Sequence, residues 1–210
     1  MSNISVIIGS CDAYFPLCRN FDILFRRYWQ ANTTDIFIGE TIPLPTYKNV
    51  LVQGPWGQRM LVGLDEVTTD YTVFILEDYY LAEPITNEFL SDHIAILEEY
   101  GADKIMFDTL YPDGVYSLTN LENDLYLFNA YSQYLNSVQP SIWRTDYLKK
   151  VLKKEMSPWE FEIEGNSYAQ SLNPRILLKA RQKKIYFNFC RRGGVFSEGW
   201  QEFLNKEKLC

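Results

Sequence analysis

The sequence predicts an α/β protein: a three-layer α/β/α sandwich with a mainly parallel central sheet and a small antiparallel edge. Strand patterns alternate with helical patterns through the first half of the chain, as in βαβ units. Residues 73–76, Val-Phe-Ile-Leu, form a continuous apolar run, which indicates a strand buried on both faces. Together these two observations predict helices on both faces of the sheet.

Each predicted strand is a short run rich in apolar, β-branched or aromatic residues, and the strands are Ile4–Ile8, Asp35–Ile38, Asn49–Val52, Thr72–Leu76, Lys104–Phe107 and Ile185–Phe189. The predicted helices have apolar residues at helical spacing, and they are Phe15–Gln30, Gly57–Val67, Asn87–Tyr100, Asp146–Lys153 and Pro158–Ser171. Three shorter patterns, at 114–118, 124–129 and 137–143, are interpreted as antiparallel pieces at an edge. No repeat or linker divides the chain, so we expect one domain over residues 1–210.

Composition narrows the class of protein. Hydrophobic residues make up 47% of the 210 residues, enough for a sizeable core, and a net charge of -7 disfavours binding to nucleic acid. No run of about 18 apolar residues and no signal peptide is visible, so we expect a cytoplasmic protein with at most peripheral contact at the inner face of the membrane. The cysteines show no CxxC spacing, which argues against a zinc site or a disulfide scaffold.

Ligands of such sheets bind at the carboxyl ends of the strands. After the first strand, residues 9–14 carry Ser10 and Asp12 but no GxGxxG pattern, so a dinucleotide site is poorly supported. Asp12 alternatively caps the next helix. After the third strand, Trp56 and Arg59 stand at a Gly-rich helix start, where backbone N–H groups and a guanidinium favour a phosphate. The alternative is a turn with a core tryptophan and a solvated arginine.

Two acids, Glu77 and Asp78, follow the fourth predicted strand. Neighbouring carboxylates can bind a divalent cation that neutralises a diphosphate, or accept hydrogen bonds from a ribose. The alternatives are that one of them caps the following turn or pairs with Arg59. Their position at the end of a buried strand favours a binding role.

The stretch from Trp56 to Tyr80, together with QPSIWRTDYL at 139–148 and SPWEFEIEG at 157–165, resembles the nucleotide-sugar glycosyltransferases of the GT-A fold, of the type that makes bacterial surface glycans. The resemblance implies that the loop after the first strand binds the nucleotide base and that a DxD or EDD motif follows the fourth strand. Here the motif reads Glu77-Asp78-Tyr79, so a tyrosine replaces a usual acidic metal ligand.

The resemblance also implies a divalent cation, manganese or magnesium, with Asp78 as its ligand. The tyrosine weakens that expectation, and Arg191 and Arg192 in CRRGG are the predicted alternative source of positive charge for the departing diphosphate. A solvated turn is the other interpretation of this arginine pair.

Inverting members of the family use a carboxylate at the start of a late helix as general base, which the resemblance assigns first to Glu160 and second to Glu162. A helix N-terminus keeps such a carboxylate ionised. Glu160 has a structural alternative, a capping box with Ser157. Three aromatic residues are predicted to contact the acceptor, with core packing as the alternative: Tyr79, Trp143 and Trp159.

The resemblance therefore implies an enzyme that transfers a sugar, with inversion, from a nucleotide-diphosphate donor such as a UDP-sugar to a hydroxyl of a glycan or lipid-linked glycan, in capsule or lipopolysaccharide synthesis. Two alternatives stay open. A nucleotidyltransferase-like enzyme shares the architecture, but residues 9–18 lack the basic residues of its phosphate loop. A catalytically silent carbohydrate-binding relative gains weight from Tyr79.

Overall fold

The computed structural model of the chain describes residues 4–107, 116–181, 183–191 and 194–209. Its helices and strands follow in the order β1 (Ile4–Gly9), α1 (Phe15–Tyr28), β2 (Thr34–Gly39), β3 (Lys48–Leu51), α2 (Trp56–Asp65), β4 (Tyr71–Leu76), β5 (Tyr79–Leu81), α3 (Asn87–Glu99), β6 (Lys104–Met106), β7 (Leu118–Glu122), β8 (Leu125–Phe128), β9 (Ser141–Arg144), α4 (Thr145–Val151), α5 (Pro158–Glu162), α6 (Gly165–Ser171), β10 (Ile176–Lys179), β11 (Tyr186–Asn188), β12 (Cys190–Arg191), β13 (Val195–Phe196) and α7 (Trp200–Lys206).

Within these residues the central sheet has nine strands in the order β3-β2-β1-β4-β9-β6-β10-β8-β7. β1 pairs in parallel with β2 and β4, β2 with β3, and β6 with β10. β9 runs antiparallel between β4 and β6, and β8 and β7 form an antiparallel edge. The prediction of a mainly parallel sheet with a small antiparallel edge is confirmed.

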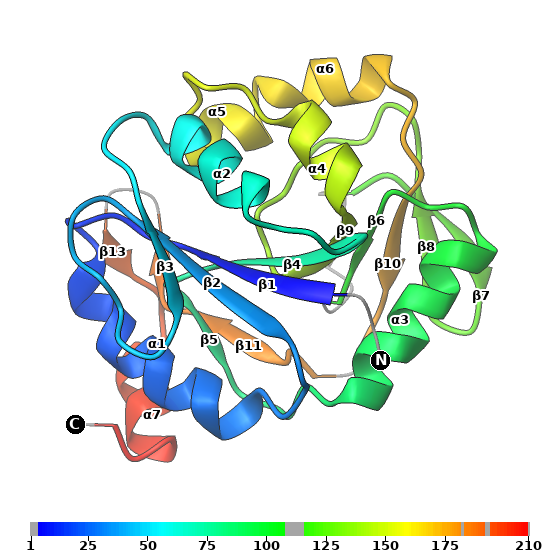
Figure 1. Cartoon of the computed structure of the whole chain (residues 1–210). Helices are drawn as coiled ribbons and strands as arrows, with labels where there is room; N and C mark the ends of the chain where they lie inside the picture. Colours follow the sequence, from blue (N-terminus) through cyan, green and yellow to red (C-terminus); the bar gives the residue numbers. More distant parts are fainter. Residues whose placement is uncertain (1–3, 108–115, 182, 192–193, 210) are drawn as a thin grey trace.

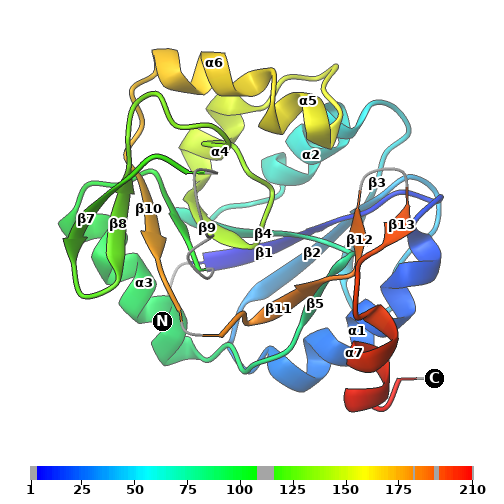
Figure 2. The ribbon, with the colours of Figure 1, turned by 180° about the vertical axis from the view of Figure 1, so that it is seen from behind.

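Helices cover both faces of this sheet, as the alternating pattern predicts. In Figure 1, α2, α4, α5 and α6 lie on one side, and α1 and α3 lie on the other. The view from behind in Figure 2 shows two small ribbons outside the main sheet. They are the antiparallel pairs β5–β11 and β12–β13, and α7 follows the second of them.

Burial explains why the central strands form. All six residues of β1 are buried, and so are the first five of β4, so both strands are covered by helices on each face. Gly63 lets α2 approach β2 closely, because a Cβ atom at this position would lie 2.0 Å from Cδ1 of Ile38. At its start, α2 lies beside the carboxyl ends of β1 and β4, where Arg59 bonds to the carbonyl of Ser10 and the Trp56 ring packs on Phe74.

The structure corrects several expected elements. β9 was expected at an edge, but it lies in the middle of the sheet because its central residues, Ile142 and Trp143, are fully buried. The helix predicted over 158–171 is two helices, α5 and α6, separated at residues 163–164. The predicted last strand of the main sheet is β11, which pairs with β5 instead.

Four strands were missed, and two of them, β12 and β13, have only two residues each. β10 is a four-residue segment, too short for its period to be identified, and the three-residue β5 begins at Tyr79, which the sequence interpretation assigned to the site. The pattern at 114–118 lies partly outside the described residues, and β7 begins at its last residue, Leu118.

Candidate active site

A cavity of about 340 Å³ opens at the carboxyl ends of β1 and β4. It is bounded by the loop after β1, the start of α2, the turn after β4, the end of β11 and helix α5. Eight of the predicted site residues line it: Ser10, Trp56, Arg59, Glu77, Asp78, Tyr79, Trp159 and Glu162. The sequence interpretation missed other lining residues that come from loop ends without a motif: Cys11, Tyr14, Asn188 and Cys190.

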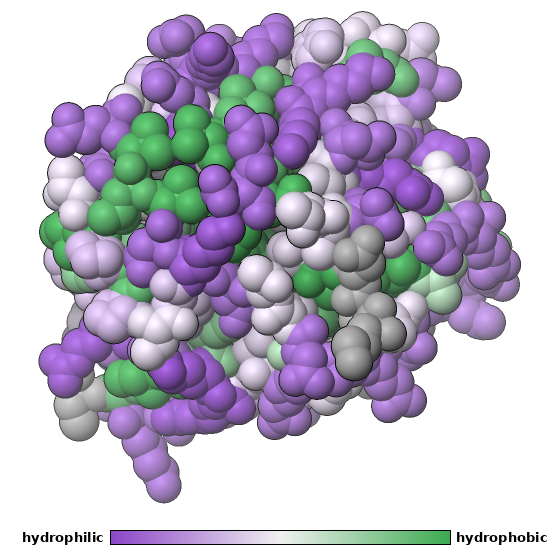
Figure 3. Space-filling view, viewed as in Figure 1, coloured by the Kyte–Doolittle hydropathy of each residue, from purple (hydrophilic) through white to green (hydrophobic). Residues whose placement is uncertain are grey.

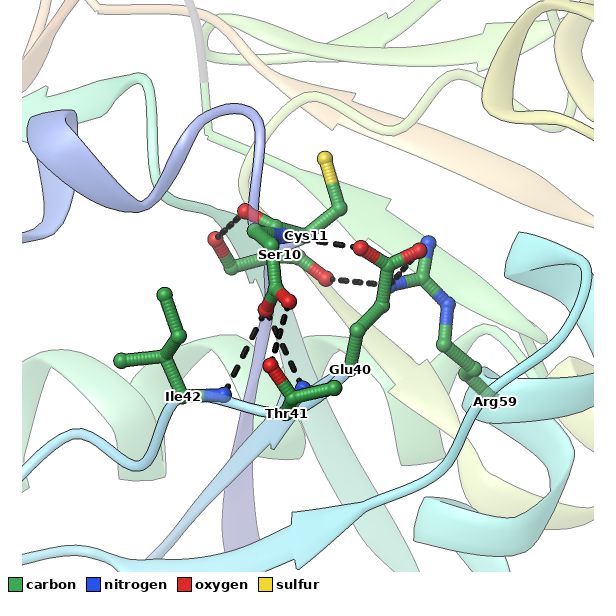
Figure 4. A network of polar contacts seen from close by, with 7 residues as sticks. Ser10, Cys11, Glu40, Thr41, Ile42 and Arg59 are labelled. Atoms are coloured by element: carbon green, nitrogen blue, oxygen red, sulfur yellow. Dashed lines mark hydrogen bonds and ion pairs between the residues drawn. The ribbon is translucent and has the colours of Figure 1, made fainter.

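Arg59 is a buried guanidinium held by the loops after β1 and β2 (Figure 4). Its Nη1 donates to the carbonyl of Ser10 at 2.9 Å and lies 3.2 Å from Oε1 of Glu40. The other carboxylate oxygen of Glu40 accepts from the backbone N–H of Asp12 at 2.9 Å. One interpretation of the sequence paired Arg59 with Glu77 or Asp78. In the structure, the ion pair of Arg59 is with Glu40, which belongs to none of the motifs identified in the sequence.

Asp12 does not line the cavity, so its predicted contact with the donor is not supported. Its carboxylate accepts hydrogen bonds from the backbone N–H groups of Thr41 and Ile42 and from the hydroxyl of Thr41. These bonds lower the pKa of Asp12. It does not cap α1 either, since Tyr14 occupies the N-cap position. Asp12 instead ties the loop after β1 to the loop after β2.

The start of α2 differs from the predicted phosphate site. The backbone N–H groups of Gly57 and Gln58 donate to the carbonyls of Met156 and Lys154, at 2.8 and 2.9 Å. The contact requires glycine, because a Cβ atom at Gly57 would lie 2.0 Å from the carbonyl oxygen of Lys153. These two N–H groups are therefore occupied, and the expectation that they bind a phosphate is wrong.

Trp56 combines the two roles that the sequence left open. Its ring packs in the core, with ring centres 6.0 Å from Phe74 and 5.6 Å from Phe161. The same side chain lines the cavity, where its buried Nε1 has no hydrogen-bond partner. Core packing thus fixes the ring at the edge of the cavity.

The acids after β4 lie in a strongly desolvated wall. Burial raises the pKa of Glu77 well above its usual value, and the neighbouring charge of Asp78 adds to the effect. Burial also raises the pKa of Asp78 to about 7, and the charge of Glu162 contributes. The carbonyl of Asp78 accepts from the backbone N–H of Phe189 at 2.7 Å, which fixes this turn against the end of β11.

The two candidate bases on α5 occupy different environments. Glu160 forms the reciprocal capping box: its Oε2 accepts from the N–H of Ser157 at 2.7 Å, and its own N–H donates to the Ser157 hydroxyl at 3.3 Å. These bonds lower the pKa of Glu160, and its side chain does not line the cavity. Glu162 does line it, and its Oε1 accepts from the N–H of Val138 at 2.7 Å. Burial raises the pKa of Glu162.

Several residues that line this cavity carry a buried polar atom without a hydrogen-bond partner. Of eight such side-chain atoms in the described part of the chain, four belong to lining residues: the donors Trp56 Nε1 and Arg59 Nε, and the acceptors Asp78 Oδ1 and Asn188 Oδ1. Each buried unsatisfied group costs about 1–3 kcal/mol. Such costs are typical of sites where a polar ligand completes the hydrogen bonds.

Two of the three aromatic residues predicted to contact the acceptor line the cavity. Tyr79 lines the cavity and packs edge-on against Tyr186, with 5.3 Å between ring centres. Trp159 lines it as well. Trp143 is fully buried in the sheet core and does not line it, so its expected contact with an acceptor is not supported. Of Arg191 only the backbone, in β12, is described, and Arg192 lies outside the described residues.

The carboxylates that line this cavity are the ligand type that a manganese or magnesium ion prefers. In the residues that the structure describes, no group of three or more His, Cys, Asp or Glu side chains is placed to hold a metal ion. Magnesium, however, is often bound through one or two carboxylates together with substrate phosphates. Asp78, with its unpartnered Oδ1, fits that second mode and not a site made only of protein ligands.

None of the helices in the described ranges combines the length and apolarity needed to cross a membrane.

Comparisons with known proteins find similarity in structure alone. No family model and no curated protein sequence matches the chain. The TarS 1-349 fragment of S. aureus in complex with UDP-GlcNAc is similar over 98% of this chain and 65% of its own, with 17% identity and a TM-score of 0.60. The same fragment with UDP is similar over 89% of this chain and 60% of its own, at 16% identity and a TM-score of 0.58.

A second neighbour is CMP:2-keto-3-deoxy-manno-octonic acid synthetase complexed with CTP. The similarity covers 99% of this chain and 98% of the synthetase, with 10% identity and a TM-score of 0.56. TarS is a GT-A glycosyltransferase, and the synthetase is nucleotidyltransferase-like. The chain spans about two thirds or less of the TarS fragment, and at these identities the comparisons establish a shared fold.

Proposed function

We propose that the chain is a GT-A-type glycosyltransferase that transfers a sugar from a nucleotide-diphosphate donor, a UDP-sugar, to a hydroxyl of a glycan. The observation that carries the proposal is the meeting of Asp78 and Glu162 at one cavity that Trp56 and Arg59 also line, each with a buried N–H group that has no hydrogen-bond partner. Donors suit the diphosphate and ribose oxygens of a nucleotide sugar. The shared fold of TarS, which binds UDP-GlcNAc, supports this choice.

In the proposed mechanism, the carboxylate of Glu162 accepts the proton of the acceptor hydroxyl. The acceptor oxygen attacks the anomeric carbon as the bond from that carbon to the diphosphate breaks, and this single displacement inverts the configuration. We assign the base to Glu162 rather than Glu160 because Glu162 lines the cavity, whereas the Glu160 carboxylate is bonded to Ser157. A half-buried base with a raised pKa is well matched to proton transfer near neutral pH.

Tyr79 and Trp159 are the proposed contacts of the acceptor, a glycan or lipid-linked glycan of a surface polysaccharide such as capsule or lipopolysaccharide. A manganese or magnesium ion, where present, would supply positive charge to the departing diphosphate, with Asp78 as its protein ligand. Arg59, and Arg191 and Arg192 as the sequence suggests, are proposed to share that charge stabilisation.

Dependence on a divalent ion is expected to be partial. Because Tyr79 replaces an acidic ligand and the Arg59 guanidinium lies in the cavity wall, treatment with a chelator should reduce transfer without abolishing it. The measurement is the rate of UDP release in EDTA, with and without added manganese. Complete loss in EDTA that manganese fully restores would contradict this prediction.

A nucleotidyltransferase is the second candidate, favoured by the similarity to the CTP-bound synthetase over nearly the whole of both chains. Against it, residues 9–18, which include the loop after β1, contain no lysine or arginine to hold a triphosphate.

Titration calorimetry with UDP-GlcNAc, UDP-glucose, UDP-galactose, GDP-mannose and CTP, each with and without manganese, separates the candidates. We expect binding of a UDP-sugar and none of CTP. Binding of CTP, with release of pyrophosphate when a sugar acid is added, would favour the nucleotidyltransferase. A protein that binds glycans but no nucleotide sugar would be the catalytically silent relative.

A further inference from the structure

Lys104 is a lysine buried completely inside the protein. It lies in β6, and its side chain has no exposed surface. Its Nζ donates to the carbonyl oxygens of Leu135 and Ser137, at 3.1 and 2.8 Å, and lies 4.1 Å from the centre of the Trp143 ring. Burying a charge costs several kcal/mol, so a lysine at such a position calls for a compensating role.

The two carbonyls belong to a loop that leads directly to the candidate base. The loop, residues 135–138, precedes β9, and its last N–H group, that of Val138, donates to Oε1 of Glu162 at 2.7 Å. The hydroxyl of Ser137 also bonds to Glu162 and stabilises its charged form. Lys104 therefore bonds to the main chain of the segment that holds the carboxylate.

The same loop is fixed to the helices that carry the base. The side-chain amide of Asn136 donates to the carbonyls of Phe161 and Gly165, at 3.4 and 3.2 Å. The side chain of Asn166 accepts from the N–H of Leu135 at 2.8 Å. With Lys104 on its other side, the loop is anchored to both the sheet and the α5–α6 pair.

Charges around Glu162 come from several elements. Asp78, in the turn after β4, interacts with it as a like charge, while Lys104 in β6 and Glu162 each favour the charged form of the other. On its own helix, Glu160 is engaged by Ser157. Burial opposes both charges, lowering the pKa of Lys104 and raising that of Glu162, and the charge of each group partly offsets the effect of burial on the other.

We propose that Lys104 is the positioning residue of the general base: from the core it fixes the 135–138 loop that orients the Glu162 carboxylate, and its ammonium group compensates the negative charge of that carboxylate. This inference rests on the proposed function for the role of Glu162 as base, but not for the coupling between the two side chains. Trp143, expected from sequence to face an acceptor, instead supports this ammonium group with its ring.

The coupling can be measured without any substrate. The carboxyl carbon of Glu162 is followed by ¹³C NMR against pH in the wild type and in Lys104→Met, with Glu162→Gln to assign the signal. We expect the pKa of Glu162 to rise in Lys104→Met and to stay unchanged in Lys150→Met, a matched loss of a lysine charge at an exposed position on α4. An unchanged pKa of Glu162 in a folded Lys104→Met protein would overturn the proposal.

Lys104→Met removes two hydrogen bonds in the core, so a second measurement covers the case in which it fails to fold. Coupling between two sites is reciprocal. Glu162→Gln should therefore lower the pKa of Lys104, followed through its ¹³Cε signal, whereas Glu160→Gln should leave it unchanged. Equal pKa values of Lys104 in the wild type and Glu162→Gln would overturn the proposal on their own.

Turnover then connects the coupling to catalysis. Below the pKa of a base, each unit by which that pKa rises reduces the ionised fraction, and hence the rate, about tenfold. In Lys104→Met the acid limb of kcat for UDP release should shift to higher pH by the shift that NMR records. If the pKa values of Glu162 and Lys104 shift as expected but Glu162→Gln turns over normally, Glu162 is not the base, while its coupling to Lys104 is supported. If Glu162→Gln is inactive but the pKa of Glu162 does not change in Lys104→Met, the base is supported and the coupling to Lys104 is refuted.

Discussion

Glu162→Gln is expected to reduce sugar transfer by roughly 10²-fold or more, the usual scale for a positioned proton acceptor. Glutamine keeps the volume of the side chain and can still accept the hydrogen bond from Val138 N–H, so the loop and the fold should remain. What is lost is the ability to take a proton from the acceptor hydroxyl. Donor affinity, measured by calorimetry, should change little.

Glu160→Gln is the matched control, because it makes the same chemical change two residues earlier on the same helix, α5. Its amide oxygen can still accept from the N–H of Ser157, so the capping box is largely preserved. We expect its rate of transfer to stay within a few-fold of the wild type. Normal turnover in Glu162→Gln together with a dead Glu160→Gln would return the base to Glu160, and normal turnover in both would refute the inverting mechanism proposed here.

Asp78→Asn is expected to reduce transfer by roughly 10²-fold, comparable to the loss of one preorganised electrostatic group in an active site. The substitution keeps the volume but removes the charge that is proposed to face the ribose or a cation. Unlike Glu162→Gln, it should also weaken donor binding in calorimetry. Unchanged transfer would exclude Asp78 from the site.

The same variant should be more stable than the wild type when no ligand is bound. Since folding raises the pKa of Asp78 to about 7, its protonated form favours the folded state, and this contribution is complete below the unfolded pKa and lost as pH rises through 7. Asparagine carries no charge to bury. The gain in the free energy of unfolding should therefore grow between pH 5 and 8, with an upper limit of about 4 kcal/mol.

Urea unfolding of the wild type and Asp78→Asn at pH 5, 6, 7 and 8 measures this gain. Glu77 and Glu162 have pKa values raised in the same direction, so the wild type itself should lose stability over this interval. A variant less stable than the wild type across the whole range would show that ionised Asp78 stabilises the fold.

The sequence by itself determined the layer architecture and half of the residues that line the cavity. The apolar run of β4 is unambiguous because both faces of that strand are buried, and the residue after a central parallel strand must lie at the carboxyl edge of the sheet. For this reason Glu77 and Asp78 could be placed in the site from the pattern alone. The capping box of Glu160 could likewise be predicted from the sequence, since it depends on two residues three positions apart.

Only the tertiary structure decided the contacts between segments far apart in the chain. Whether Glu160 or Glu162 lines the cavity depends on the orientation of a short helix, α5, which is fixed by the 135–138 loop. Trp143, an aromatic residue just ahead of a predicted helix, was expected to contact the acceptor, but it is buried because β9 lies between β4 and β6. The occupied N–H groups of α2 and the hydrogen bonds of Lys104 to the 135–138 loop also arise from long-range packing, which no local pattern records.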